Sequence, residues 1–210
     1  VAQFITCFFL FFDSTYFDLL NQIDNLLFKF ISILIIVIFL SAIINFCNFM
    51  DGIDGMLGGS ILVCLLSYSF MLGGSIWALI GSLFGFLIWN WKPSKIFMGD
   101  IGSNFLGGVF VWILLNTENI VDAFSILLIA TPLLIDPLFC LFRRIYLKQN
   151  IFNPHSLHLY QRLCRSGLSH DSVSIIYMFS SIFISICYFA GGLKIEIFSI
   201  FIIFLLALWL

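Results

Sequence analysis

Residues Phe28 to Met56 read FKFISILIIVIFLSAII followed by NFCNFMDGIDGM. The first part, Phe28–Ile44, is an almost uninterrupted apolar run that is long enough to cross a bilayer as a helix. Asp51 and Asp54 follow where this run ends, and each precedes a glycine that allows a tight turn. Such a turn brings carboxylates and free N–H groups into one small region, which suits a metal ion or a phosphate. A polar turn between two membrane helices is the alternative, because a lone DGxDG pattern is weak.

The composition is typical of a membrane protein. Hydrophobic residues make up 62% of the 210 residues, charged residues 10%, and the mean hydropathy is +1.15. Soluble domains have about 45–50% apolar and about 25% charged residues. Long apolar runs without alternation favour helices over barrel strands in lipid. We therefore expect an all-α, polytopic transmembrane helical bundle of about seven to eight helices, forming a single integral membrane domain over residues 1–210 with no nucleic-acid partner.

The apolar runs predict a short opening segment at Val1–Phe12 and seven crossing helices. These are expected at Phe28–Ile44, Leu57–Leu72, Ile76–Trp89, Asn104–Leu115, Val121–Phe142, Ser172–Ala190 and Ile195–Leu210. Alternating them across the bilayer places seven Lys and Arg residues on one face and two on the other. The positive-inside rule makes the first face cytoplasmic. Residues 48–56, 90–103 and 143–171 all fall on that face.

A second polar motif, WNWKPSKIFMGDIGSNFLGG, runs from residue 89 to 108. Asp100 is flanked by Gly99 and Gly102, which predicts an open turn leading into the next helix, with Ser103 or Asn104 as its N-cap. An isolated GDxGS is more often a simple turn. A third carboxylate on the face that carries the DGIDG turn would repel the other two unless a cation or a proton neutralised them. Magnesium fits such oxygen ligands together with substrate phosphates.

The third motif is NPHSLHLYQRL, residues 153–163. His155 and His158 have i, i+3 spacing and are expected to share a helix face with Arg162. Zinc is a weaker interpretation, because no third nitrogen or sulfur ligand is positioned locally and Cys164 is isolated. Contacts to a diphosphate fit better, since arginine binds phosphate in bidentate geometry. A solvated basic loop that orients the protein in the membrane is the alternative.

Asp136 lies inside an apolar run, next to Pro137. Carboxylates inside membrane segments are costly and are functional or paired. The sequence leaves two simple explanations open beside a functional one: an ion pair with Arg143 or Arg144, or a hydrogen bond to a neighbouring helix.

The three motifs, in this order and with these apolar runs, resemble the polyprenyl-phosphate N-acetylhexosamine-1-phosphate transferases of the glycosyltransferase 4 family. This family includes the enzyme that makes lipid I and the enzymes that initiate O-antigen synthesis. PHSLHLYQRL, in place of a histidine triplet, resembles the O-antigen-initiating type. The resemblance implies transfer of N-acetylhexosamine-1-phosphate from a UDP-sugar to a membrane polyprenyl phosphate, such as undecaprenyl phosphate, with Mg²⁺. The products are UMP and a polyprenyl-diphospho-sugar for cell-envelope polysaccharide.

The resemblance also implies roles for individual residues. Asp100 is the expected magnesium ligand and is catalytic together with Asp51 and Asp54. The expected substrate-binding residues are Asn48 and Asn90 at the nucleotide, and His155, His158 and Arg162 at the phosphates or sugar. It further implies a multi-pass protein of the cell inner membrane with cytoplasmic active-site loops, and a possible homodimer.

One departure from the family pattern is clear. The family carries paired aspartates on an earlier cytoplasmic loop, and this sequence has no adjacent aspartates. We therefore expect N-terminal helices of the family fold to be missing before Val1, and the chain as given to be unable to complete the reaction. An inactive or noncatalytic membrane fragment is one alternative. An ion or proton transporter using carboxylates as a relay is a weaker one, because only Asp136 lies deep in a helix.

Overall fold

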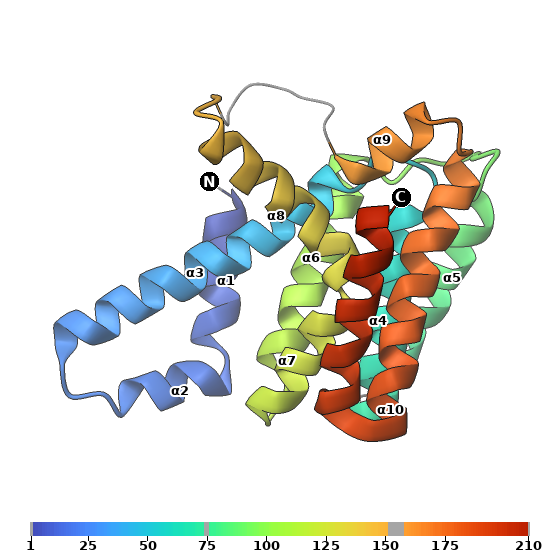
Figure 1. Ribbon diagram of the computed structural model, residues 1–210. Helices are drawn as coiled ribbons and strands as arrows, with labels where there is room; N and C mark the ends of the chain where they lie inside the picture. The colour runs from blue at the N-terminus through green and yellow to red at the C-terminus, as the bar shows by residue number, and fades with distance from the viewer. Residues whose placement is uncertain (1, 74–75, 151–157, 210) are drawn as a thin grey trace.

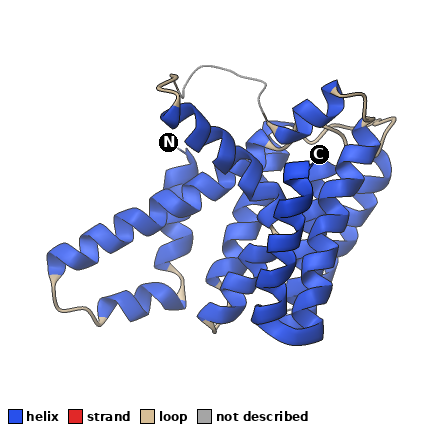
Figure 2. Cartoon of the chain, viewed as in Figure 1, coloured by secondary structure: helices blue, strands red, loops and turns tan. Residues whose placement is uncertain are grey.

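The computed structural model describes residues 2–73, 76–150 and 158–209, and these ranges contain ten helices and no strand (Figure 2). The predicted all-α class is confirmed. The structure adds two short helices, α2 (Thr15–Asn21) and α9 (Leu159–Arg165), to the expected elements. It also divides one expected span in two, which brings the number above the predicted seven to eight.

Two helices are long and apolar enough to cross a bilayer by themselves, α3 (Leu26–Phe49) and α10 (His170–Trp209). A bent pair, α7 (Ile120–Ile129) and α8 (Thr131–Tyr146), forms a third candidate span if the two halves count as one. The remaining apolar helices are shorter: α1 (Ala2–Phe12), α4 (Met56–Leu72), α5 (Trp77–Asn90) and α6 (Gly99–Leu115). The chain is therefore a helical membrane protein.

The bundle is built around α3, α4 and α6. α6 packs against α3, and α4 packs against both α5 and α10 (Figure 1). A Cβ at Gly107 of α6 would lie 3.0 Å from the Cα of Ile44 in α3, so the absence of a side chain lets the two backbones approach closely. Small residues at such contacts are what association of helices in lipid requires.

The predicted span Val121–Phe142 is wrong as a single helix. α7 ends at Ile129, α8 begins at Thr131, and the two axes are bent by 76°. Pro132 is the second residue of α8. Proline has no N–H to donate and is well tolerated in the first turn of a helix, so Pro132 favours a new helix beginning here.

The helix predicted to begin at Asn104 begins instead at Gly99. The side chains of Ser103 and Asn104 donate to the carbonyls of Gly99 (3.2 Å) and Asp100 (2.6 Å), one turn earlier. Neither residue is therefore an N-cap, and Asp100 lies in the first turn of α6 rather than on an open turn.

The last two predicted helices correspond to the two arms of α10. The backbone is not helical at Gly191 and Gly192, and Gly192 has a positive φ of 68°. Only glycine adopts this conformation at no steric cost. The chain reverses here, and the second arm runs back beside the first (Figure 1).

Candidate active site

The DGIDG turn joins α3 to α4, and the side-chain amide of Asn90 holds it in place. Gly55 has φ 76° and donates its N–H to Oδ1 of Asn90 at 3.0 Å. The Nδ2 of Asn90 donates to the carbonyl of Ile96 at 2.9 Å, and the residue is only 5% exposed. Asn90 therefore ties this turn to the connection between α5 and α6. Its predicted contact with a nucleotide stays a prediction.

Helices α9 and α10 cover the other side of the turn. A Cβ at Gly52 would overlap the hydroxyl of Tyr160 in α9. Ser174 of α10 donates its hydroxyl to the carbonyl of Asp54 at 2.7 Å. The side chain of Tyr160 lies directly against the backbone of residue 52 and favours glycine there, which is a second reason for the DG pattern beyond turn geometry.

The three predicted carboxylates interact electrostatically. Asp51 is half-buried, and burial together with the charges of Asp100 and Asp54 raises its pKa to about 6. Asp51 therefore lies within electrostatic reach of the other two carboxylates, which belong to the first two of the three motifs. Mutual repulsion of this kind is relieved by a proton or a cation.

These carboxylates suit a divalent cation that also binds a substrate. In the described part of the chain, the one group whose ligand atoms all lie within 4.8 Å of one another is Asp136, Cys140 and His158. The carboxylate oxygens of Asp51, Asp54 and Asp100 therefore do not all lie within 4.8 Å of one another. Mg²⁺ usually takes one or two carboxylates and completes its shell with water and phosphate oxygens, so this open donor set fits it.

Asp100 faces α1 across a cavity of about 420 Å³, which Gln3, Thr6 and Asn104 also line. Gln3 donates its side-chain amide to Oδ1 of Asn104 at 2.6 Å. Asn48 accepts from the hydroxyl of Ser103 at 2.6 Å. A polar network therefore joins α1, α3 and α6 beside Asp100, and it includes Asn48, one of the predicted substrate-binding residues.

Asp136 fastens α9 to the rest of the molecule. Its carboxylate is 4% exposed and accepts from the backbone N–H groups of Leu159 (2.7 Å) and Tyr160 (3.1 Å) and from the hydroxyl of Tyr177 (2.8 Å). The first N–H groups of a helix have no acceptor within it, and Asp136 supplies one for α9. Of the two simple explanations for Asp136, the neighbouring helix is the right one.

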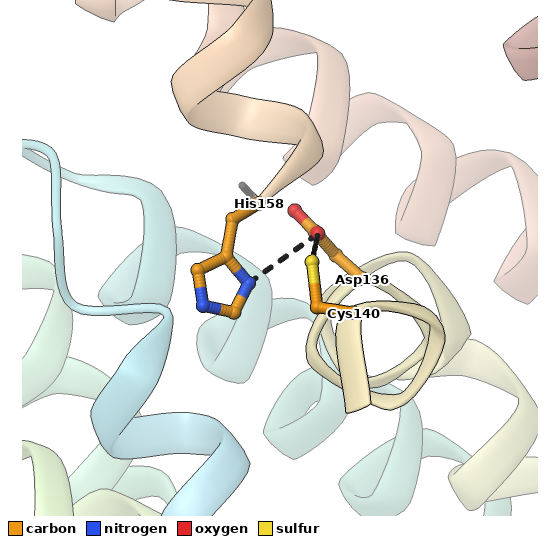
Figure 3. A group of neighbouring side chains, drawn as sticks. All are labelled: Asp136, Cys140 and His158. Carbon is orange, nitrogen blue, oxygen red and sulfur yellow. Dashed lines mark hydrogen bonds and ion pairs between the residues drawn. The ribbon is translucent and has the colours of Figure 1, made fainter. Parts of the chain in front are cut away.

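His158 precedes α9 as its N-cap, so the predicted helix face shared by His155, His158 and Arg162 is wrong for His158. His155 lies outside the described residues. His158 Nδ1 lies 3.5 Å from Oδ1 of Asp136, and Cys140 is adjacent (Figure 3). The premise that no further metal ligand lies near His158 is therefore corrected. The Sγ of Cys140 lies 3.9 Å from Oδ1 of Asp136.

Comparison with known proteins assigns the chain to a family. Residues 1–118 match the model of glycosyl transferase family 4. The chain belongs to this family. The matched region contains all three clustered carboxylates, and the predicted family resemblance is confirmed.

Several curated relatives of this family 4 chain come from bacteria. A probable undecaprenyl-phosphate N-acetylglucosaminyl 1-phosphate transferase of Bacillus subtilis is 36% identical over 188 residues, covering 83% of this chain and 52% of the relative. A phospho-N-acetylmuramoyl-pentapeptide-transferase of Latilactobacillus sakei is 33% identical, covering 74% of this chain and 50% of the relative. A decaprenyl-phosphate N-acetylglucosaminephosphotransferase of Mycobacterium tuberculosis is 30% identical, covering 69% of this chain and 44% of the relative. The chain spans about half the length of these relatives.

Some residues of the candidate site were not predicted from the sequence. Tyr160 lies within the third motif, two residues after His158, so its position could have been noted. Gln3 and Tyr177 stand singly in apolar runs. Nothing local distinguishes them, because their roles depend on which helices pack together.

Proposed function

We propose that this chain carries the donor-binding half of a phospho-N-acetylhexosamine transferase. In the reaction, an oxygen of a membrane polyprenyl phosphate attacks the β-phosphorus of a UDP-N-acetylhexosamine. The bond from that phosphorus to the bridging oxygen breaks, and UMP leaves with the bridging oxygen and its electron pair. The observation that carries the proposal is the hydrogen bond from Ser103 to Asn48, which joins the start of α6, where Asp100 lies, to the end of α3, just before Asp51 and Asp54. Burial and the charges of Asp100 and Asp54 raise the pKa of Asp51 to about 6. The names of the relatives support the class of acceptor and donor.

The carboxylates supply the charge arrangement that phosphoryl transfer needs. Asp100, with Asp51 or Asp54, would hold Mg²⁺, which when bound neutralises charge on the donor phosphates. The transfer depends chiefly on positioning and on stabilising charge at the transferred oxygens. The asparagine network around Asn48 and the amide of Asn90 keep the two carboxylate-bearing segments in register with each other.

The loop that carries His158 and Arg162 completes the site in this proposal. The contact of Tyr160 with Gly52 places α9 directly against the DGIDG turn. A histidine and an arginine there can donate hydrogen bonds to the donor diphosphate or the sugar. The choice of N-acetylhexosamine and a role in O-antigen-like polysaccharide synthesis belong to the same proposal.

The membrane setting follows from the distribution of charge. Seven of nine Lys and Arg residues fall on one face when the apolar helices alternate. We assign that face to the cytoplasm of a bacterial inner membrane, where UDP-sugars are made. The donor site would then open to the compartment that supplies its substrate.

A proton relay is less well supported. Such a relay needs free carboxylates within several helices. Asp51 and Asp54 lie in a turn, and Asp100 lies in the first turn of its helix. Both oxygens of Asp136 accept hydrogen bonds from α9.

The test is release of UMP from UDP-N-acetylglucosamine with undecaprenyl phosphate, measured on the protein in lipid bilayers across a magnesium titration. We expect magnesium-dependent release that Asp100→Asn abolishes. Asp24→Asn is the matched control, because Asp24 is an equally exposed carboxylate on the loop before α3. Normal turnover by Asp100→Asn would remove Asp100 from the site.

A further inference from the structure

A basic cleft lies between α8 and α9, and its lining includes none of Asp51, Asp54 and Asp100. It has a volume of about 480 Å³ and is lined by Phe139, Arg143, Arg162 and Arg165. Within the described residues, the one ion pair joins His158 to Asp136, so no carboxylate lies within 4.0 Å of these arginines. Among the described residues, the cleft thus gathers three positive charges without a paired carboxylate. An anion is the complementary ligand.

α8 has the amphipathic character of a helix at the edge of a bilayer. α8 is bent by 76° from α7, so if α7 runs along the bilayer normal, α8 runs close to the membrane plane. Its buried face carries Leu133, Asp136, Pro137, Cys140 and Arg144. Its opposite face exposes Ile135, Leu138, Phe139, Phe142, Ile145 and Tyr146. A helix with an exposed apolar face and arginines near its end is typical of the membrane interface.

An exposed arginine of α8 lies next to exposed phenylalanines. Arg143 directly follows Phe142 and lies one helical turn after Phe139. Phe139 also forms part of the cleft wall, so the cleft joins a cationic part to an apolar part. A water-soluble phosphate would use only the cationic part. A lipid would use both, with its phosphate on the arginines and its glycerol and acyl carbons against the phenylalanines.

We propose that this cleft binds the phosphate headgroup of an anionic membrane lipid. The guanidinium groups from two helices form bidentate hydrogen bonds to the phosphate oxygens. Basic pockets between helices on the cytoplasmic side are a recognised setting for anionic headgroups. The bound lipid bridges α8 and α9. The cleft shares Arg162 with the proposed donor site, so the test below leaves Arg162 unchanged.

The test is native mass spectrometry of the protein released from micelles that contain equal amounts of phosphatidylglycerol and phosphatidylcholine. We expect one retained phosphatidylglycerol on the unmodified protein. The double variant Arg143→Gln, Arg165→Gln removes two cleft charges without touching Arg162, the arginine assigned to the donor site. Each basic residue near an anionic surface contributes about fivefold, so retention should fall about 30-fold.

Two further measurements separate the alternatives. Lys92→Gln, Lys95→Gln removes the same charge from the exposed connection between α5 and α6, and it should leave retention unchanged. Inorganic pyrophosphate at millimolar concentration should not displace the lipid. Equal loss in both double variants, displacement by pyrophosphate, or equal retention of phosphatidylcholine would each overturn the proposal. Thermal unfolding curves that superimpose would show that the cleft variant is folded.

Discussion

Two aspartates of this chain occupy contrasting environments. Asp136 accepts hydrogen bonds from two backbone N–H groups and a tyrosine hydroxyl. Asp51 instead faces two other carboxylates, and its pKa is raised to about 6 by burial and by their charges. A carboxylate surrounded by donors holds structure together, whereas one surrounded by carboxylates favours binding of a cation. Asp136 therefore anchors α9, whereas Asp51 belongs to the proposed cation site.

At Asp136, substitution by asparagine should loosen α9. The amide keeps one acceptor oxygen and places an NH₂ group against a donor, so at least one buried N–H or O–H loses its partner at a cost of about 1–3 kcal/mol. Amide hydrogen exchange of Leu159 and Tyr160 should accelerate while exchange in α4 is unchanged. Asp122→Asn is the control, since Asp122 accepts a single tyrosine hydroxyl at 3.1 Å. Unchanged exchange at both amides would contradict the anchoring role.

Substitution of Gly52 by alanine should displace Tyr160. The added methyl group would overlap the tyrosine hydroxyl, and overpacking of this kind costs about 1–3 kcal/mol. Thermal unfolding should move to lower temperature, and Tyr160→Phe in the same chain should restore part of the loss. Gly85→Ala is the control because its Cβ would meet nothing within 4 Å. Equal stability of the Gly52 and Gly85 variants would mean that α9 does not rest on this turn.

Among the elements, the contact between α3 and α6 determines how closely the carboxylate-bearing segments approach. Gly107→Ala should separate the two helices, because its Cβ would lie 3.0 Å from the Cα of Ile44. The neighbouring Gly108→Ala places the same methyl group in open space. Thermal unfolding in detergent should show a loss of about 1–3 kcal/mol for the first variant alone. Similar curves for both would show that the helices have room to adjust.

The elements also show what the sequence could predict. α4 and α5 begin and end within one residue of the predicted Leu57–Leu72 and Ile76–Trp89, because their apolar runs are bounded by glycine and polar residues. The bend before α8 was missed although Pro132 signals it, since uniform hydrophobicity on both sides resembled one long span. The docking of α9 was not predictable. It depends on Asp136 and Gly52, which are distant from α9 in sequence.

The candidate site, like the helices, was predictable from the sequence only in part. The grouping of Asp51, Asp54 and Asp100 followed from glycine-flanked carboxylates on one face of an alternating bundle. The attachment of Asn90 to Gly55 did not follow, since a buried amide between two loops leaves no periodic signal. Polar residues in turns reveal chemistry locally, whereas the residues that hold those turns in place are recognised only after folding.

Across the whole molecule, charge distribution predicts the orientation in the membrane. Single cysteines at Ser94, Asn119 and Ser166, introduced after the native cysteines are replaced by alanine, report the side on which each lies. A membrane-impermeant thiol reagent added outside intact cells should label Asn119→Cys alone. Labelling of Ser94→Cys from outside would overturn the cytoplasmic assignment of the proposed active site.

The central claim is that clustered carboxylates and a divalent cation together bind the donor. Isothermal titration of UDP-N-acetylglucosamine into the protein in bilayers tests it most directly, because binding does not require the acceptor. We expect binding that needs Mg²⁺ and that weakens about 100-fold in Asp100→Asn, as for loss of a metal ligand or its immediate support. Asp24→Asn should bind like the unmodified protein. Equal affinity with and without Mg²⁺, or unchanged affinity in Asp100→Asn, would contradict the claim.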